Sequence, residues 1–347
     1  MNIVHAILSF NTGGAETMLV DILNEQVKSH RVTLVIINES YEPRLLEQVD
    51  GRVVRHFLHR CPGSRSPWPL LRLNLLVRRL HPDALHLHHS SLFRMLFPGV
   101  CSRLFLTVHA LGVDLQSVRR ATCLFAISQV VAEDIRRRSS CAVAVIPNGI
   151  VVDRIRRKSH YAPLEGRRMR VVNVARLESD DKGQDLLIRA LGELRRQGED
   201  LAEADFIGTG RDAEKLAALA REEGVEDRIR LLGLRDRPYI YAHLADYDVM
   251  CHPSRHEGFG LTVAEGMAAG LPILAASGDG PAELIEQGRL GLLFENGSAD
   301  SCACQLAALY RHYDRQVALT DEAAEKVKRQ YSVSRMAADY VAAYEKR

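Results

Sequence analysis

The chain repeats one local pattern from end to end: a short run rich in β-branched and other apolar residues, then a segment of helical length, then another such run. Strands that alternate with helices along a sequence favour parallel sheets wound by helices on both faces. The pattern stops once, at the polar and basic stretch 154–169, and then resumes. We therefore predict an α/β fold with two doubly wound domains that face each other across a cleft. The predicted strands are 2–8, 31–37, 52–58, 84–89, 103–109, 123–128 and 143–147 in the first half, and 170–177, 204–208, 228–234, 248–254, 272–277 and 291–294 in the second.

The length supports this division, because 347 residues suit two domains of roughly 100 to 200 residues better than one core. We place the first domain at 1–160 and the second at 161–332, followed by a last helix at about 333–347. Seven cysteines without a C-x-x-C pair fit a reducing compartment. The amino terminus is typical of a strand rather than a signal peptide, and no apolar run approaches the ~18 residues of a membrane span. We expect an intracellular protein.

Charge is divided unevenly between the two halves. Residues 1–170 hold 24 Lys and Arg against 13 Asp and Glu, a net +11, and residues 171–347 hold 22 against 31, a net −9. This asymmetry indicates that the first half faces something anionic, such as a phospholipid surface or a phosphate-bearing acceptor. Arginines scattered over a solvated surface explain it equally well.

The segment 68–82 bears on the same question. It interleaves Trp68 and several leucines with Arg72, Arg78 and Arg79. A basic amphipathic helix of this kind lies in a membrane interface, but a helix that packs its leucines onto a sheet has the same sequence pattern. We favour packing and keep peripheral membrane attachment as a hypothesis.

Ligands of doubly wound sheets bind beyond the carboxyl ends of the strands, so we look for functional residues there. In the first half, Gly13 and Gly14 precede a helix that is expected to start near Ala15, and paired glycines let a backbone approach an anionic or hydroxyl-rich ligand. A tight turn alone explains them as well. His109 follows the fifth strand and is placed to donate a hydrogen bond to a sugar hydroxyl or to carry a proton. The run 86–89 contains three histidines, but no carboxylate or cysteine completes a metal site, so we predict no metal.

In the second half, the first strand leads to Arg176 and then to Lys182. Two cations at a helix start make a plausible clamp for a diphosphate. A departing diphosphate gains charge as its bond to carbon breaks, so fixed cations stabilise the transition state more than the ground state. Solvent-exposed cations beside Asp180 and Asp181 are the simpler alternative.

Two glutamates stand eight positions apart in the stretch 256–272, HEGFGLTVAEGMAAGLP. If a helix begins near Gly260, Glu257 lies in the loop before it and Glu265 lies about two turns in, ~12 Å away at ~1.5 Å per residue. That is the span from the sugar to the ribose of a nucleotide-sugar. The loop acid would hold sugar hydroxyls, the helix acid would hold the ribose diol, and the N–H groups of residues 259–262 would face the phosphates. Helix capping by Glu257 and a partnered core position for Glu265 are the structural alternatives.

Taken together, these residues resemble the retaining glycosyltransferases of family 4, which have the GT-B fold of two Rossmann-like domains. The resemblance covers nearly the whole chain. It is carried by GGAE at 13–16, TVH at 107–109, AIS at 126–128, IPNGI at 146–150 with Asp153, ARL at 175–177 with Lys182 and Gly183, IGTG at 207–210, LLG at 231–233, HPSRHEGFGLTVAE at 252–265 and GLLFE at 291–295.

The resemblance implies roles for particular residues. Arg176 and Lys182 would contact the donor diphosphate, Glu257 the donor sugar and Glu265 the ribose, while His109 would contact the sugar or stabilise the reacting centre. The catalytic set is then His109, Glu257, Arg176 and Lys182. The donor-binding set is Gly13, Gly14, Arg176, Lys182, Gly208, Gly210, Gly233, Glu257, Gly258, Phe259, Gly260, Leu261, Thr262 and Glu265.

It also implies the chemistry. Such enzymes move a hexose from a nucleotide-diphosphate sugar, here a UDP-sugar by preference, to a hydroxyl of a glycan or glycolipid, without a cofactor or a required metal. The departing phosphate would itself help to deprotonate the acceptor on the front face of the sugar. The first domain would hold the acceptor, and the last helix would pack back on it. Two departures, Ala175 before the arginine and the ALGVD turn at 110–114, weaken the expected acceptor contacts.

Other functions remain open. The turn GTGRDA at 208–213 fits the G-x-G-x-x-A fingerprint of an NAD-dependent enzyme, with Asp236 as the ribose acid, but it follows the second strand of its half rather than the first. A sugar-nucleotide epimerase, a phosphorylase with a pyridoxal-phosphate lysine and a non-catalytic partner subunit would keep the same fold. We favour a cytoplasmic transferase of bacterial cell-envelope polysaccharide or lipopolysaccharide synthesis, at the inner face of the membrane if it attaches there, with no nucleic-acid partner.

Overall fold

The computed structural model describes residues 1–11, 13–64 and 66–346. Contacts divide the chain into one unit of Met1–Ile150 with Tyr331–Arg347 and a second unit of Val151–Gln330. Residues 151–160, which the sequence analysis assigned to the first domain, therefore belong to the second unit. The reason is local bonding, since the Arg156 N–H donates to the Tyr241 carbonyl and the Lys158 N–H to that of Ala269.

The first unit is built on a parallel sheet, whose described strands number seven in the order β3-β2-β1-β4-β5-β6-β7. Every strand predicted for this half is confirmed. The strands are β1 Asn2–Ile7, β2 Arg31–Asn38, β3 Val54–Arg60, β4 Ala84–Leu87, β5 Leu104–Val108, β6 Cys123–Ala126 and β7 Val143–Val145. The helices are α1 Gly14–Gln26, α2 Pro43–Leu46, α3 Trp68–Leu80, α4 Gln129–Arg138 and α14 Val333–Glu345, with the 3-10 turns η1 Ser90–Met95 and η2 Val118–Arg120.

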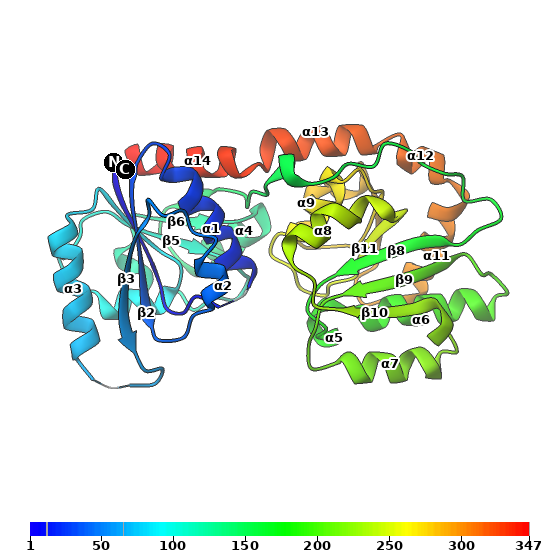
Figure 1. Cartoon of the computed structure of the whole chain (residues 1–347), viewed down its shortest axis with the longest axis horizontal. Helices are drawn as coiled ribbons and strands as arrows, with labels where there is room; N and C mark the ends of the chain where they lie inside the picture. Colours follow the sequence, from blue (N-terminus) through cyan, green and yellow to red (C-terminus); the bar gives the residue numbers. More distant parts are fainter. Residues whose placement is uncertain (12, 65, 347) are drawn as a thin grey trace. The chain divides into compact units, whose positions relative to one another are not determined.

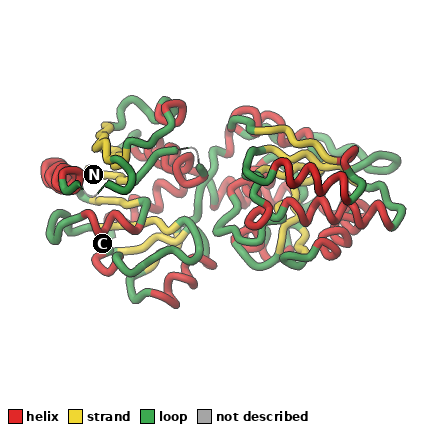
Figure 2. Tube along the Cα trace, turned by 90° about the horizontal axis from the view of Figure 1, so that it is seen from below, coloured by secondary structure: helices red, strands yellow, loops and turns green. Residues whose placement is uncertain are grey.

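Burial explains why these runs form a parallel sheet. The central strands β1, β4 and β5 are buried along nearly their whole length, as expected for strands that helices cover on both faces. Figure 2 shows the yellow strands of each unit flanked by red helices.

The last helix, α14, packs against α1 of the first unit (red in Figure 1). Ser332 caps it by accepting a hydrogen bond from the Arg335 N–H. The side chains of Tyr340 and Tyr344 are completely buried. Burial of two tyrosines is favourable only when their hydroxyls have partners, and both hydroxyls do, as described below.

The second unit contains a parallel sheet of six described strands in the order β10-β9-β8-β11-β12-β13. All strands predicted for this half are confirmed. They are β8 Met169–Val174, β9 Ala202–Ile207, β10 Ile229–Gly233, β11 Val249–His252, β12 Ile273–Ala276 and β13 Leu292–Phe294. The helices are α5 Ser179–Lys182, α6 Gln184–Arg196, α7 Ala213–Glu222, α8 Arg237–His243, α9 Leu261–Ala268, α10 Gly280–Leu284, α11 Ala299–Arg311, α12 Tyr313–Val317 and α13 Thr320–Gln330, with the 3-10 turns η3 Val152–Arg154, η4 Glu226–Arg228, η5 Leu244–Asp246 and η6 Glu286–Gly288.

The loops after β8, β9, β11 and β12 leave the same edge of this sheet, because the strands are parallel. These loops carry most of the residues that the sequence analysis selected. Among the described residues, no helix has the length and apolarity needed to cross a membrane.

Candidate functional site

The closest contact among the predicted site residues joins Lys182 and Glu257. The Lys182 Nζ lies 2.7 Å from Glu257 Oε2, although 75 positions separate the two residues. Lys182 ends α5, which follows β8, and Glu257 lies in the loop after β11. Because β8 and β11 are neighbours in the sheet, the two loops leave adjacent strand ends and meet.

The backbone and the carboxylate of Glu257 are held separately. Its N–H donates to Asp279 Oδ2 at 3.0 Å, and His252 Nε2 lies 3.8 Å from its Oε2. Burial alone would raise the pKa of the Glu257 carboxyl, but His252, Lys182 and a hydrogen bond from the Phe259 N–H outweigh it and lower this pKa. The group is therefore a carboxylate at neutral pH, and it accepts hydrogen bonds.

Helix α9 begins at Leu261, as predicted, directly after Gly260. The φ of Gly260 is +94°, in the left-handed region that favours glycine. Thr262 Oγ1 lies 3.4 Å from His252 Nδ1, which ties the first turn to β11. Glu265 is buried in the second turn, with 9% of its surface exposed. The rest of the predicted segment, Gly258 and the buried Phe259, forms the turn before the helix.

The side chain of Arg176 is held less firmly than that of Lys182. Its carbonyl accepts a hydrogen bond of 2.7 Å from the Gln184 side chain, so the backbone is fixed. Its side chain is 68% exposed and has a weak ion pair of 3.3 Å with Glu178. The guanidinium is thus anchored at its base and extends into solvent at the same sheet edge as Lys182.

Gly208, Gly210 and Gly233 lie at the ends of β9 and β10. An added Cβ on Gly208 would come within 2.0 Å of the Ala175 carbonyl oxygen, and one on Gly210 within 2.3 Å of that of Leu177. The Gly208 N–H donates to the Gly233 carbonyl at 2.9 Å. These glycines let three loops pack closely, which accounts for the G-x-G-x-x-A match without a dinucleotide.

The first unit carries the remaining predicted residues. Helix α1 starts at Gly14, one residue before the predicted start, and Gly13 is its extended N-cap. His109 follows β5. Its Nε2 is buried and has no hydrogen-bond partner among the described residues. Burial lowers the pKa of His109 to about 4, so the imidazole is neutral at pH 7.

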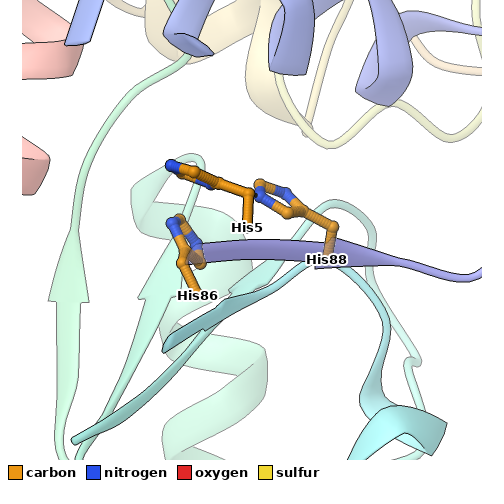
Figure 3. Close-up of side chains that lie close together, drawn as sticks. All are labelled: His5, His86 and His88. Carbon is orange, nitrogen blue, oxygen red and sulfur yellow. Dashed lines mark hydrogen bonds between the residues drawn. The ribbon is translucent and has the colours of Figure 1, made fainter. Parts of the chain in front are cut away.

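A histidine cluster of His5, His86 and His88 lies on one side of β1 and β4 (Figure 3). The strand register sets His5 opposite His86, and His86 and His88 share a face because they are two residues apart. His5 Nδ1 lies 3.1 Å from His88 Nε2, and His5 Nε2 lies 2.8 Å from the Gln26 Oε1. The sequence pattern indicated the histidines at 86–89 but not His5, because His5 joins them only through the pairing of β1 with β4.

The rest of the network reaches the last helix. His86 Nδ1 lies 2.6 Å from the Tyr344 hydroxyl and His86 Nε2 lies 2.7 Å from Thr107 Oγ1, which in turn lies 3.0 Å from the Tyr340 hydroxyl. Five of the six ring nitrogens therefore have protein partners, and His88 Nδ1 has none within the described part of the chain. Ligand atoms of the three rings lie within 4.8 Å of one another, but a metal ion would displace several of these bonds. The network fastens α14 to the sheet.

Sequence reasoning missed two further residues beside Glu257, namely His252 and Asp279. His252 stands in the segment that was selected, but it was given no role. Asp279 follows β12, whose carboxyl end lies next to that of β11. Neighbouring strand order is the signal that would have found it, and that order is a property of the fold rather than of the local sequence.

Two family models match the chain in succession. The model described as Glycosyltransferase Family 4 matches residues 12–154. The model described as Glycosyl transferases group 1 matches residues 156–326, which include all the site residues of the second unit.

Curated relatives are similar over part of their length. A GDP-mannose-dependent alpha-(1-6)-phosphatidylinositol monomannoside mannosyltransferase of Mycobacterium tuberculosis is 32% identical over 215 residues, which are 57% of this chain and 54% of that protein. A putative colanic acid biosynthesis glycosyltransferase, WcaL of Salmonella typhimurium, is 29% identical over 197 residues, 55% of this chain and 48% of that protein. The chain thus spans about half the length of the curated relatives it matches.

Solved structures are similar over the whole chain. Anabaena Alr3699/HepE, crystallised with UDP and glucose, superimposes with a TM-score of 0.82 at 21% identity and covers 99% of both chains. The lipopolysaccharide outer core galactosyltransferase WaaB superimposes with a TM-score of 0.77 at 17% identity and covers 100% of both. This likeness confirms the predicted fold.

Proposed function

Because the chain belongs to the glycosyltransferases that join a family 4 domain to a group 1 domain, we propose that it transfers a hexose from a nucleoside-diphosphate sugar to a hydroxyl of a glycan or glycolipid. One observation carries this proposal. The Lys182–Glu257 pair, the exposed guanidinium of Arg176 and the start of α9 lie at one edge of the second sheet, and together they offer cations, N–H donors and a carboxylate.

The diphosphate is assigned to Arg176, Lys182 and the first N–H groups of α9. The positive end of a helix favours anions, and the exposed arginine is free to turn onto a phosphate. As the bond from phosphate to sugar breaks, negative charge grows on the diphosphate. Lys182, which Glu257 already holds in place, stabilises that charge with little reorganisation.

The two glutamates are assigned to the two ends of the donor. Glu257 is ionised, because its pKa is lowered, and a carboxylate accepts hydrogen bonds from sugar hydroxyls. Glu265 lies about two helical turns further on and holds the ribose diol. Only 9% of the surface of this residue is exposed.

The stereochemistry is proposed from the resemblance to the retaining glycosyltransferases of family 4, and the surroundings of Glu257 are consistent with it. Its carboxylate is paired with Lys182, so it is better suited to binding than to nucleophilic attack. We infer retention of configuration by a front-face substitution in which the departing phosphate accepts the acceptor proton, without a metal or a cofactor. His109 is neutral at pH 7, so it donates a hydrogen bond to the transferred sugar rather than a charge.

Donor and acceptor are proposed from the relatives. The Mycobacterium relative is named as GDP-mannose-dependent, and the Anabaena structure holds UDP and glucose; we take a UDP-sugar first and a GDP-sugar second. The names of the relatives that concern colanic acid and lipopolysaccharide support an acceptor of the bacterial cell envelope. Such an acceptor would be met at the cytoplasmic face of the inner membrane.

Helix α3 supplies a surface for that encounter. Its inner face buries Leu73 and Val77, and its outer face leaves Trp68 69%, Leu71 43% and Leu75 60% exposed. The sequence analysis favoured packing, and the helix does pack, but it also has a second apolar face. Arginines at 72, 78 and 79 are exposed along the same helix, and this combination is typical of helices that lie on anionic lipid.

A thermal-shift panel of UDP, GDP, ADP, CMP and their sugar conjugates tests the nucleotide assignment. One nucleoside diphosphate at ~100 times its dissociation constant should stabilise the wild type by about 2.7 kcal/mol, and Glu265→Ala should lose this effect. Release of that nucleotide only in the presence of an acceptor separates a transferase from an epimerase. Stabilisation by NAD and by no nucleoside diphosphate would overturn the proposal.

Cosedimentation with vesicles tests the membrane surface. Wild type should bind phosphatidylglycerol vesicles, and a variant with Trp68, Leu71 and Leu75 changed to Ser should not. Leu234→Ser is the matched control, because Leu234 is as exposed, at 68%, but lies in the second unit. Equal binding by both variants would remove α3 from the proposal.

A further inference from the structure

Arg255 lies two residues before Glu257 and has no role in the site described so far. Its guanidinium forms a fork with Asp185 of α6, with Nη1 to Oδ1 and Nη2 to Oδ2 both at 2.8 Å. Nη1 also donates to the Ser179 carbonyl at 2.6 Å. The side chains of the pair are 27% and 20% exposed, so this geometry is partly shielded from water and from salt.

The backbone of Arg255 is tied down on both sides. Its N–H donates to the Asp181 carbonyl at 2.8 Å, and its carbonyl accepts from the Asn296 side chain at 2.9 Å. Asp181 is the residue before Lys182. One residue therefore holds the segment that carries Glu257 against the helical turn that carries Lys182.

The adjoining glycine shows how closely these two segments approach. Gly183 has a φ of +65°, and an added Cβ would lie 1.9 Å from the Pro253 carbonyl oxygen. Any side chain here would push the β11 loop away from α5. The short distance between Lys182 and Glu257 thus depends on a backbone contact that Gly183 permits and that Arg255 holds.

We propose that Arg255, with Asp185, is a positioning residue that sets the separation of the diphosphate-binding lysine from the sugar-binding carboxylate. The inference rests on the proposed function of that site. A bidentate pair fixes both distance and angle, which a lysine does not, and site residues need to be held within about 0.5 Å to be productive. Donor use should therefore depend on the fork itself and not only on a positive charge at this position.

The test compares Arg255→Lys with Arg167→Lys. Arg167 is a matched control, since it also forks an aspartate, Asp248, at 2.6 and 3.0 Å and donates to a backbone carbonyl. That pair lies just before β8 and β11, at the opposite edge of the same sheet. Both variants should lose similar thermal stability. Only Arg255→Lys should lose kcat/KM for the donor, by about 10- to 100-fold.

Two further readouts separate positioning from general stability. Asp185→Asn should reproduce the loss, and the double variant should lose no more than either single one, because one fork is broken in all three. Hydrogen exchange of the unliganded protein should be faster at residues 253–260 and 179–186 in Arg255→Lys than in Arg167→Lys. Equal kcat/KM in the two variants, or equal exchange in these segments, would overturn the inference. A wild type that binds no nucleoside diphosphate would instead refute the proposed function, while the exchange measurement would still decide what Arg255 holds.

Discussion

Lowering the pH from 7 to 5 is expected to destabilise the first unit through its buried histidines. Burial lowers the pKa of His5 to about 4, against 6.5 in the unfolded chain. Between these values the unfolded chain binds more protons than the folded one, so the free energy of unfolding falls as the pH falls. This difference in the pKa of His5 corresponds to about 3 kcal/mol of unfolding free energy, all of which is lost once the pH is below 4. About 2 kcal/mol of it is lost between pH 7 and pH 5.

The neighbours of His5 act in the same direction. Burial also lowers the pKa values of His86 and His88 well below the ordinary range. The three rings share one network, so the first proton would repel the next, and their effects are not additive. The Tyr344 hydroxyl bonds to His86 of β4 and the Tyr340 hydroxyl to Thr107 of β5, so opening should begin where α14 meets β4 and β5.

Hydrogen exchange at peptide resolution, corrected for the intrinsic rate at each pH, measures this opening in β1, β4 and β5. The variant His5→Gln should remove about 2 kcal/mol of the pH dependence, whatever its stability at pH 7. The control is His59→Asn, an exposed histidine with a positive φ that asparagine tolerates. An opening free energy in wild type that is the same at pH 7 and pH 5, or a His5→Gln slope equal to that of wild type, would refute the argument.

Three other outcomes are expected. Tyr344→Phe removes the hydroxyl bound to His86 and should cost about 1–3 kcal/mol in urea unfolding monitored by circular dichroism; no change would mean that the bond contributes nothing. Gly183→Ala should lower the free energy of unfolding by over ~2 kcal/mol in the same measurement. Gly224 also has a left-handed backbone, but an added Cβ there would meet nothing within 4 Å, so Gly224→Ala should lower it by about 1 kcal/mol. Equal losses would contradict the close packing at Gly183. Glu257→Gln should reduce kcat for sugar transfer by at least tenfold while the dissociation constant of the nucleoside diphosphate changes less than threefold; a parallel loss of nucleotide affinity in isothermal titration calorimetry would mean that Glu257 acts by holding Lys182 and not by binding the sugar.

The fold was predictable because its signals are local. Each strand is a short apolar run of about the length that a buried parallel strand requires, and the intervening segments carry helical periodicity. The residues at which the strands end were predicted less accurately. Strand β4 stops at Leu87 rather than at position 89, since His88 and His89 begin the turn into η1 and the His89 side chain caps it.

The contacts within the site were not predictable, because they depend on which strands become neighbours. The positions of Lys182 and Glu257 near strand ends were readable, but their ion pair requires β11 to lie beside β8. The histidine cluster likewise requires β4 to lie beside β1 in the register that sets His86 opposite His5. The sequence did not show which leucines of α3 are exposed, because a helix that buries its leucines and a helix that exposes some of them have the same leucine-rich pattern.

The distribution of charge limits how a nucleotide-sugar is drawn to the second unit. The second unit, residues 151–330, holds 26 Lys and Arg against 31 Asp and Glu, a net −5, so its summed field repels a donor that is itself an anion. Attraction must then come from groups in contact with the phosphates, namely Arg176, Lys182 and the start of α9. Salt at 0.1 M screens charges that are more than ~10 Å apart, but it weakens interactions between groups in direct contact much less. Donor affinity should therefore change little between 0.05 and 0.3 M salt, whereas vesicle binding through the basic first half should weaken strongly. If donor affinity weakened strongly and vesicle binding did not, long-range charge rather than the loops after β8 and β11 would attract the donor.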